Sequence, residues 1–132
     1  MTEHLAVDEL LIAAGHTGGG HPQVRDPGAL AAAAARPQTT MFGLDAYLTL
    51  QAKAAALLHS IVRNDPMVDG NKGLGWLATV AFLEINGYEL RIADPGTAED
   101  FVVAVADGRV DVDAAAAFIE QHWRPLLVRP RG

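Results

Sequence analysis

The sequence of 132 residues has no cysteine, and that absence excludes disulfide bonds and thiolate metal sites. Basic residues are also few: ten lysines and arginines stand against sixteen acids, which gives a formal net charge of −6. Proteins that bind nucleic acid normally present a basic face, so we expect no direct binding of nucleic acid. A chain without cysteine agrees with a reducing compartment, and we expect a cytoplasmic protein.

Long apolar runs are missing as well. Apolar runs such as Ala31–Ala35 and Ala114–Ile119 are too short to cross a bilayer, so no membrane contact is expected. The opening stretch "MTEHLAVDEL" carries acids and has no basic segment followed by an apolar one, and we expect no signal peptide. Half of the residues are hydrophobic and a fifth are charged, which is enough for a packed core. The length fits a single domain over residues 1–132.

Apolar residues recur with the period of a helix over most of the chain. The clearest stripe begins at Leu50 and continues at spacings of three and four residues, which predicts one buried face of a long helix. Pro66 disfavours a helical conformation at the residue before it, so this helix should end near Asn64. A second stripe of matching length follows from Leu74. We therefore expect two central helices that pack together, with a loop between them.

Further helices are predicted around this central pair. Asp26, directly before a proline, predicts a helix cap, and Thr97–Asp100 resembles a capping box at the start of another helix. Residues 37–43 are interpreted as a connector and residues 88–92 as a short extended piece, and the last helix is expected to carry Trp123. Together the patterns predict an all-α fold, a bundle of about six helices over residues 8–14, 27–36, 50–64, 71–85, 97–107 and 112–123.

The loop between the two central helices contains "DPMVDGNKGLGW", residues 65–76, with an acid, a glycine, an amide and an ammonium in consecutive positions. A helix that starts near Asn71 offers free backbone N–H groups and a dipole, which favour an anion there. Gly70 can take a positive φ and let a ligand approach the backbone. Asn71 can donate an amide hydrogen, Lys72 adds a positive charge, and the Asp69 carboxylate suits Mg²⁺ held together with substrate phosphates. These are the parts of a nucleotide phosphate site.

A purely structural interpretation of the loop stays open at this point. Asp69 or Asn71 can serve only as a helix cap, and Gly70 can serve only to make the turn, because such residues are common in turns. The sequence has no Walker-type G-x-x-x-x-G-K-[ST] motif that would decide between the two interpretations.

The stretch "DPMVDGNKG", Asp65–Gly73, resembles the H-x-F-x-[DE]-[GA]-N signature of the Fic and death-on-curing (Doc) family, and aligns with it without a gap. Doc proteins continue this signature with N-K-R, where Fic enzymes usually have G-R. Three further stretches are similar to segments of the same family: "RDPGALAAAAARPQ" from Arg25, "VAFLEINGYEL" from Val80 and "TAEDFVVAVADGRVDV" from Thr97.

The resemblance implies an all-helical Fic/Doc fold and a small bacterial toxin paired with an antitoxin of the Phd type. It implies ATP and Mg²⁺ as cofactors, and transfer of the γ-phosphate to a threonine of elongation factor Tu, which stops translation. Related Fic enzymes instead transfer AMP to a hydroxyl. Lys72 stands where adenylylating members usually have glycine, so the resemblance favours the kinase direction.

The sequence departs from the family signature where the chemistry takes place. The histidine that serves as general base falls on Asp65, its aromatic neighbour falls on Met67, and the phosphate-binding arginine falls on Gly73. A positioned general base contributes roughly 10²–10⁴-fold in rate, and one preorganised charge on a developing anion contributes about 10²–10³-fold. We therefore expect impaired catalysis. His59, on the helix before the loop, is expected to be a packed side chain and not a catalyst.

The sequence leads to one assignment with two alternatives. The alternatives are a catalytically inactive Doc fold that binds nucleotide or antitoxin, and a Fic-type AMP transferase. The residues assigned by the resemblance are Asp65, Asn71 and Lys72 for catalysis, Asp69, Gly70, Asn71, Lys72 and Gly73 for nucleotide binding, and Asp69 for Mg²⁺.

Overall fold

The computed structural model describes residues 1–17 and 21–127, and within them the fold is built almost entirely from helices. This confirms the expected all-α class and the six α-helices. The helices are α1 (Val7–Ala14), α2 (Pro27–Ala35), a short 3₁₀ helix η1 (Arg36–Gln38), α3 (Leu50–Asn64), α4 (Asn71–Ile85), α5 (Pro95–Ala106) and α6 (Val112–His122). Two antiparallel pairs of short strands complete the fold: β1 (Thr40–Met41) with β2 (Leu44–Asp45), and β3 (Tyr88–Leu90) with β4 (Trp123–Pro125).

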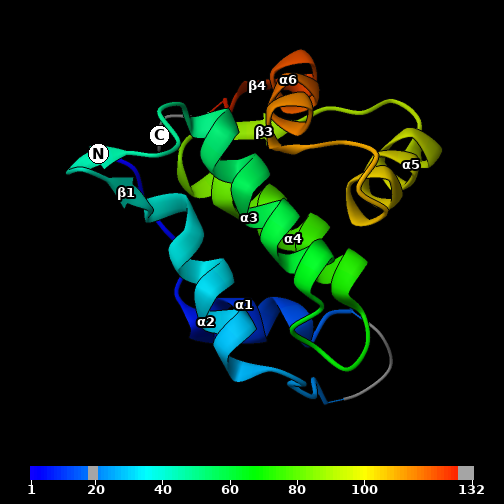
Figure 1. Cartoon of the computed structure of the whole chain (residues 1–132). Helices are drawn as coiled ribbons and strands as arrows, with labels where there is room; N and C mark the ends of the chain where they lie inside the picture. The colour runs from blue at the N-terminus through cyan, green and yellow to red at the C-terminus, as the bar shows by residue number, and fades with distance from the viewer. Residues whose placement is uncertain (18–20, 128–132) are drawn as a thin grey trace, which may run out of the picture.

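Helices α3 and α4 form the centre of the molecule, with α1 and α2 on one side and α5 and α6 on the other (Figure 1). Their predicted apolar stripes are buried against one another, and Leu58, Leu74 and Phe82 have no exposed surface. The two helices approach closely at Gly75, where a Cβ atom would lie 2.6 Å from Val62 Cγ1. This packing fixes the position of the loop that joins them.

The ends of the central helices agree with the sequence signals. Helix α3 ends at Asn64, and Asp65 after it takes a left-handed conformation with φ 45° and ψ 61°. The left-handed region is uncommon for a residue other than glycine.

Asp26 caps α2 as expected, since its Oδ1 accepts a hydrogen bond from Ala29 N at 3.0 Å. No helix within the described ranges is both long enough and apolar enough to cross a membrane.

Two predicted boundaries were wrong. Helix α5 begins at Pro95, not at Thr97, because Asp94 provides the cap and accepts a hydrogen bond from Gly96 N at 3.0 Å. Proline at the first helical position has a preset φ, so this Asp-Pro pair begins the helix earlier than the expected capping box. Trp123 lies in strand β4 and not in the last helix, because it pairs with β3 and its ring stacks on Tyr88 at 4.1 Å.

The segment expected to be a plain connector, residues 37–43, includes strand β1 and the turn of the β1–β2 hairpin. Its turn is formed by Phe42 and Gly43, both with positive φ. The buried Lys53 of α3 holds the hairpin through Asp45 Oδ2 at 3.3 Å and through the carbonyl oxygen of Tyr47. A two-stranded hairpin is only marginally stable alone, so these contacts with α3 account for its formation here.

Candidate functional site

The loop between α3 and α4 is closed by the side chain of Asn71. Its Oδ1 accepts a hydrogen bond from Met67 N at 2.9 Å, and its Nδ2 donates one to Met67 O at 2.9 Å. Met67 itself is 2% exposed and fills the apolar slot where the family signature has an aromatic residue. Gly70 precedes the helix with φ 77°, so the positive φ expected for this glycine is present. The loop is therefore a fixed turn that leads into the start of α4.

The segment before α2 pairs with this loop from the outside. Val24 and Met67 form an antiparallel bridge, and Val68 N donates to Gln23 O at 2.9 Å. The backbone N–H groups of Arg25 and Asp26 both donate to the carbonyl oxygen of Pro66, at 2.8 and 3.0 Å. Two segments about forty residues apart thus form one backbone unit.

The side chain of Arg25 reaches the end of α3. Its Nε donates to Asp65 O and its Nη2 donates to Asn64 O, each at 2.7 Å. These carbonyl oxygens lie at the C-terminal end of α3, which carries a partial negative charge. The last carbonyl groups of a helix have no N–H partner within the helix. Arg25 was not among the predicted site residues, because nothing in the local pattern around it points to a loop so far along the chain.

A cavity of about 330 Å³ lies over the loop, and it brings the predicted residues together. Among the predicted residues only Gly73 is not part of it. Two cationic and two acidic residues therefore line one small polar hollow at the start of α4. The cavity is lined by Arg25, Asp65, Met67, Val68, Asp69, Gly70, Asn71 and Lys72.

Two carboxylates, those of Asp65 and Asp69, belong to residues that line this cavity. Asp69 is exposed, and one of its oxygens, Oδ1, accepts from Gly70 N at 2.8 Å. Within residues 1–17 and 21–127 there is no group of three or more His, Cys, Asp or Glu side chains that could hold a metal ion. Mg²⁺ commonly uses one or two carboxylates together with substrate phosphates and water. The described residues supply the carboxylates of such a set, and a phosphorylated ligand and water would have to supply the rest.

Thr17, three residues after the end of α1, lies against Gly70 of the loop and Gly73 of the first turn of α4. A Cβ atom on Gly70 would lie 2.9 Å from Thr17 Oγ1, and one on Gly73 would lie 3.0 Å from Thr17 Cγ2. The hydroxyl of Thr17 is in turn anchored to Ala14 O at 3.0 Å. Thr17 therefore stands where an arginine side chain at position 73 would begin. It is a second neighbour of the site that the sequence pattern did not indicate.

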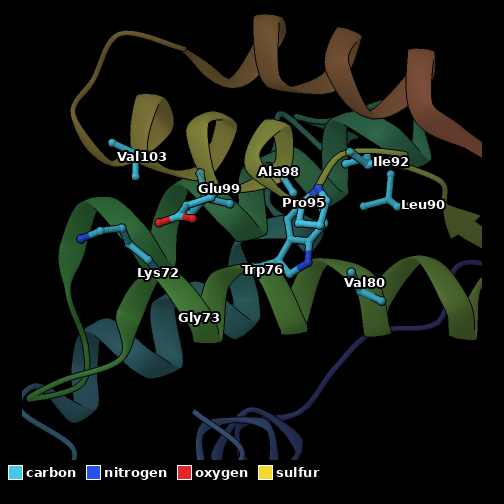
Figure 2. A pocket seen from close by; sticks show the side chains of 11 residues that line it. Lys72, Gly73, Trp76, Val80, Leu90, Ile92, Pro95, Ala98, Glu99 and Val103 are labelled. Carbon is cyan, nitrogen blue, oxygen red and sulfur yellow. The ribbon is translucent and has the colours of Figure 1, made fainter. Parts of the chain in front are cut away.

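A larger apolar groove of about 630 Å³ begins beside this cavity and runs between α4 and α5. Figure 2 shows Lys72 and Glu99 toward one end, Trp76 near the middle, and Leu90 and Ile92 toward the other end. Trp76 thus lines the groove. The remaining lining residues are Gly73, Val80, Pro95, Ala98, Val102 and Val103.

His59 lies on α3 and lines neither the cavity nor the groove. Its Nδ1 is 2.8 Å from Arg36 Nη1, which can only donate. Burial, followed by the positive charges of Arg36 and Arg63, lowers the pKa of His59, while Asp111 acts in the opposite direction. The neutral imidazole accepts a hydrogen bond here, so His59 is a packed, hydrogen-bonded residue, as expected.

Comparisons with known proteins match the sequence that contains this loop. The sequence model of the Fic/DOC family matches residues 3–83, a range that includes the loop and most of the two central helices. The chain belongs to the Fic/DOC family. It is 48% identical over 118 residues to Toxin Doc of Mycolicibacterium smegmatis, a match that covers 89% of this chain and 91% of that protein. The resemblance inferred from the loop motif is thereby confirmed.

Proposed function

We propose that this protein is the toxin of a Doc-type toxin–antitoxin module and that its loop cavity binds the phosphates of a magnesium nucleotide. The observation that carries the proposal is the cavity itself, which gathers Asp65, Asp69 and Lys72 at the start of α4. The similarity to Toxin Doc of Mycolicibacterium smegmatis over most of both chains supports the toxin assignment.

Each residue of the loop has a separate part in this proposal. The ammonium of Lys72 and the free N–H groups of the first helical turn bind phosphate oxygens. Asp69 is the carboxylate for Mg²⁺, which neutralises phosphate charge when it is bound. The side chain of Asn71 is already engaged with both polar groups of Met67, so we assign it mainly to holding the loop. Gly70 keeps the backbone in the left-handed turn that presents these groups.

The proposed reaction is transfer of the γ-phosphate to a protein hydroxyl. The hydroxyl oxygen forms a bond to phosphorus, the bond between the γ-phosphorus and ADP breaks, and the hydroxyl proton passes to a base. Asp65 is the side chain available in the cavity for that proton. A carboxylate is an inefficient base near neutral pH, since its ordinary pKa is about 3.9. Together with the missing arginine at Gly73, this makes slow transfer the expected property of the protein.

A direct test restores both missing groups and follows the label. Asp65→His supplies an imidazole, and Gly73→Arg supplies the guanidinium. Because Thr17 Cγ2 would lie 3.0 Å from the new Cβ, the arginine variant is best made with Thr17→Ser, which removes that methyl and keeps the hydroxyl. Purified elongation factor Tu, the target that the resemblance implies, is incubated with γ-labelled or α-labelled ATP.

We expect γ-label to appear slowly or not at all with the natural sequence and clearly with the triple variant. Each partial reversion should give less than the full set, because base and cation act on the same transition state. Label from the α-phosphate would instead identify an AMP transferase. A well-folded triple variant that transfers neither label would rule out the proposed reaction on this target.

We also propose the apolar groove as the binding site of the antitoxin. A groove of 630 Å³ lined mainly by apolar side chains, with Lys72 and Glu99 toward one end, suits the apolar face of an amphipathic helix. The groove adjoins the loop cavity, and Lys72 lines both. A segment bound there would lie next to the proposed nucleotide, so it would compete with catalysis. An antitoxin of the Phd type, implied by the family resemblance, is the candidate partner.

A further inference from the structure

Arg25 is a cation of the loop cavity that lies outside the motif. Two of its three guanidinium nitrogens, Nε and Nη2, hold the carbonyls of Asp65 and Asn64 at 2.7 Å. The third nitrogen, Nη1, donates to no group within residues 1–17 and 21–127. Arg25 also lines the cavity with Asp69 and Lys72. The guanidinium is thus held in place on one side and keeps hydrogen-bond donors free on another.

The backbone holds Arg25 in this position independently of its side chain. Its own N–H and that of Asp26 donate to Pro66 O, and Val68 N donates back to Gln23 O. These bonds lie on both sides of Arg25 in the chain. Its Cα is therefore fixed relative to the loop, and little conformational freedom is left to lose when a ligand binds.

The charge of the cavity shows why a second cation matters. Asp65 and Asp69 bring two carboxylates, while Lys72 brings one positive charge. The position where the family signature has its phosphate-binding arginine is Gly73, and Thr17 stands against it. Without another cation, a polyphosphate would meet more negative than positive charge. Arg25 restores the balance from a different segment.

We infer that Arg25 is the second phosphate-binding cation of this site and takes the place of the arginine that position 73 lacks. A guanidinium binds phosphate oxygens with directed, charge-assisted hydrogen bonds. Arg25 and Lys72 line one cavity, and two cations there suit a ligand with several phosphate groups. The ligand class is therefore a nucleoside polyphosphate with Mg²⁺. The inference rests on the proposed function of the loop cavity and deepens it.

The test compares the affinities of the natural protein, Arg25→Gln and Arg25→Lys for Mg·ATP and for AMP by titration calorimetry. Arg25→Gln should weaken Mg·ATP binding about ten- to hundredfold, the range for a lost charged hydrogen bond, and AMP binding by much less. Arg25→Lys keeps the charge but cannot hold two carbonyls with a rigid fork. It should therefore retain more of the Mg·ATP affinity than Arg25→Gln while losing similar thermal stability.

Arg63 provides a matched control. It is exposed, its Nη1 donates to Ala106 O at 2.8 Å at the end of α5, and it does not line the loop cavity. Arg63→Gln removes a comparable helix-capping contact and one positive charge. Its Mg·ATP affinity should stay within about twofold of the natural protein, whereas its melting temperature should fall.

The possible results separate the inference from the proposal beneath it. If the natural protein binds Mg·ATP and Arg25→Gln binds it equally well, the inference is wrong and the proposed function stands. If Arg25→Gln and Arg25→Lys lose affinity equally, and equally for ATP and AMP, Arg25 only clamps the loop and the inference is again wrong. If the natural protein binds no Mg·ATP at millimolar concentration, the proposed nucleotide site fails, and the role of Arg25 fails with it.

Discussion

At the scale of single residues, Asn71 and Lys72 are neighbours with different tasks. Asn71 is partly buried, and its amide satisfies both backbone groups of Met67. Lys72 is exposed and lines both the cavity and the groove. The sequence motif presents the two as one phosphate-binding pair. The structure separates a residue that shapes the loop from a residue that is free to bind a ligand.

This separation predicts different effects of two alanine substitutions on stability and on nucleotide binding. Asn71→Ala leaves the polar groups of Met67 without partners and should lower the free energy of unfolding by about 1–3 kcal/mol. Lys72→Ala removes an exposed side chain and should change it by less than about 0.5 kcal/mol. If the loop cavity is the proposed nucleotide site, Mg·ATP should raise the melting temperature, because a ligand that binds only the folded state stabilises it, and Lys72→Ala should reduce that rise. Urea titration and thermal melts with and without Mg·ATP measure both effects. Equal stability of the two variants would contradict the separation.

His59 leads to a prediction about pH. Burial and the nearby arginines lower its pKa below the ordinary 6.5, so the unfolded state binds a proton more readily than the folded state. The contribution of His59 to the free energy of unfolding is therefore fully present above about pH 6.5 and decreases as the pH is lowered below that value. His59→Gln offers Arg36 an uncharged acceptor and should flatten this decline. Urea unfolding of both proteins at pH 7.5 and pH 5.5 checks the result, and an identical pH dependence would contradict it.

At the scale of elements, the packing of α3 on α4 depends on a glycine in the middle of a helix. Glycine normally weakens a helix by about 1 kcal/mol relative to alanine. At Gly75, however, a Cβ atom would meet Val62 Cγ1 at 2.6 Å and Leu58 Cδ1 at 3.0 Å. Two packed helices can come this close only where a side chain is missing, so packing decides the residue here and helix propensity does not.

Gly75→Ala should therefore destabilise the protein, although alanine is the better helix former. Overpacking costs about 1–3 kcal/mol, which exceeds the propensity gain of about 1 kcal/mol. Gly96→Ala in the first turn of α5 is the matched control, because its Cβ would only reach ordinary contact with Asp94 at 3.4 Å. This control should be neutral or slightly stabilising. Chemical denaturation of the two variants gives the comparison, and a stabilised Gly75→Ala would show that the helices can move apart at little cost.

At the scale of the whole molecule, the groove between α4 and α5 (Figure 2) adjoins the loop cavity, because Lys72 lines both. The chain segments that line it come from both central and C-terminal parts of the sequence, from Lys72 to Val103. Because the hollows share Lys72, a partner in the groove and a nucleotide in the cavity would be neighbours. Under the proposal above, an antitoxin bound in the groove would therefore compete with the nucleotide for the same space beside Lys72.

A charge placed in the groove should weaken antitoxin binding. Val103→Glu puts a carboxylate on the apolar wall and should reduce the affinity for the proposed Phd-type antitoxin by at least about tenfold, the cost of burying an unpaired charge in an interface. Ile12→Glu, at a side chain 66% exposed on α1, is the control and should bind normally. Size exclusion and calorimetry with the purified antitoxin give the result. Equal binding by both variants would place the antitoxin elsewhere.

The sequence by itself determined the helices, most of their ends, and the family. Periodic apolar residues, the Asp26 cap and Pro66 act within a few neighbouring positions, so their effects can be predicted from the local sequence. The loop motif, Asp65–Gly73, likewise lies within one short stretch. These features fixed the all-α class and the residues of the candidate phosphate site, whose binding of nucleotide stays a prediction.

Only the tertiary structure decided which distant residues complete the site. Arg25 donates a hydrogen bond to the carbonyl oxygen of Asp65, forty positions along the chain. Thr17 packs against Gly73, and Trp123 pairs with β3 in place of continuing the last helix. Local periodicity does not predict such long-range contacts, because they depend on where whole helices pack. The residues of the loop can be identified from the local sequence. The residues that surround them depend on the packing of α1, α2 and α5 around the central pair.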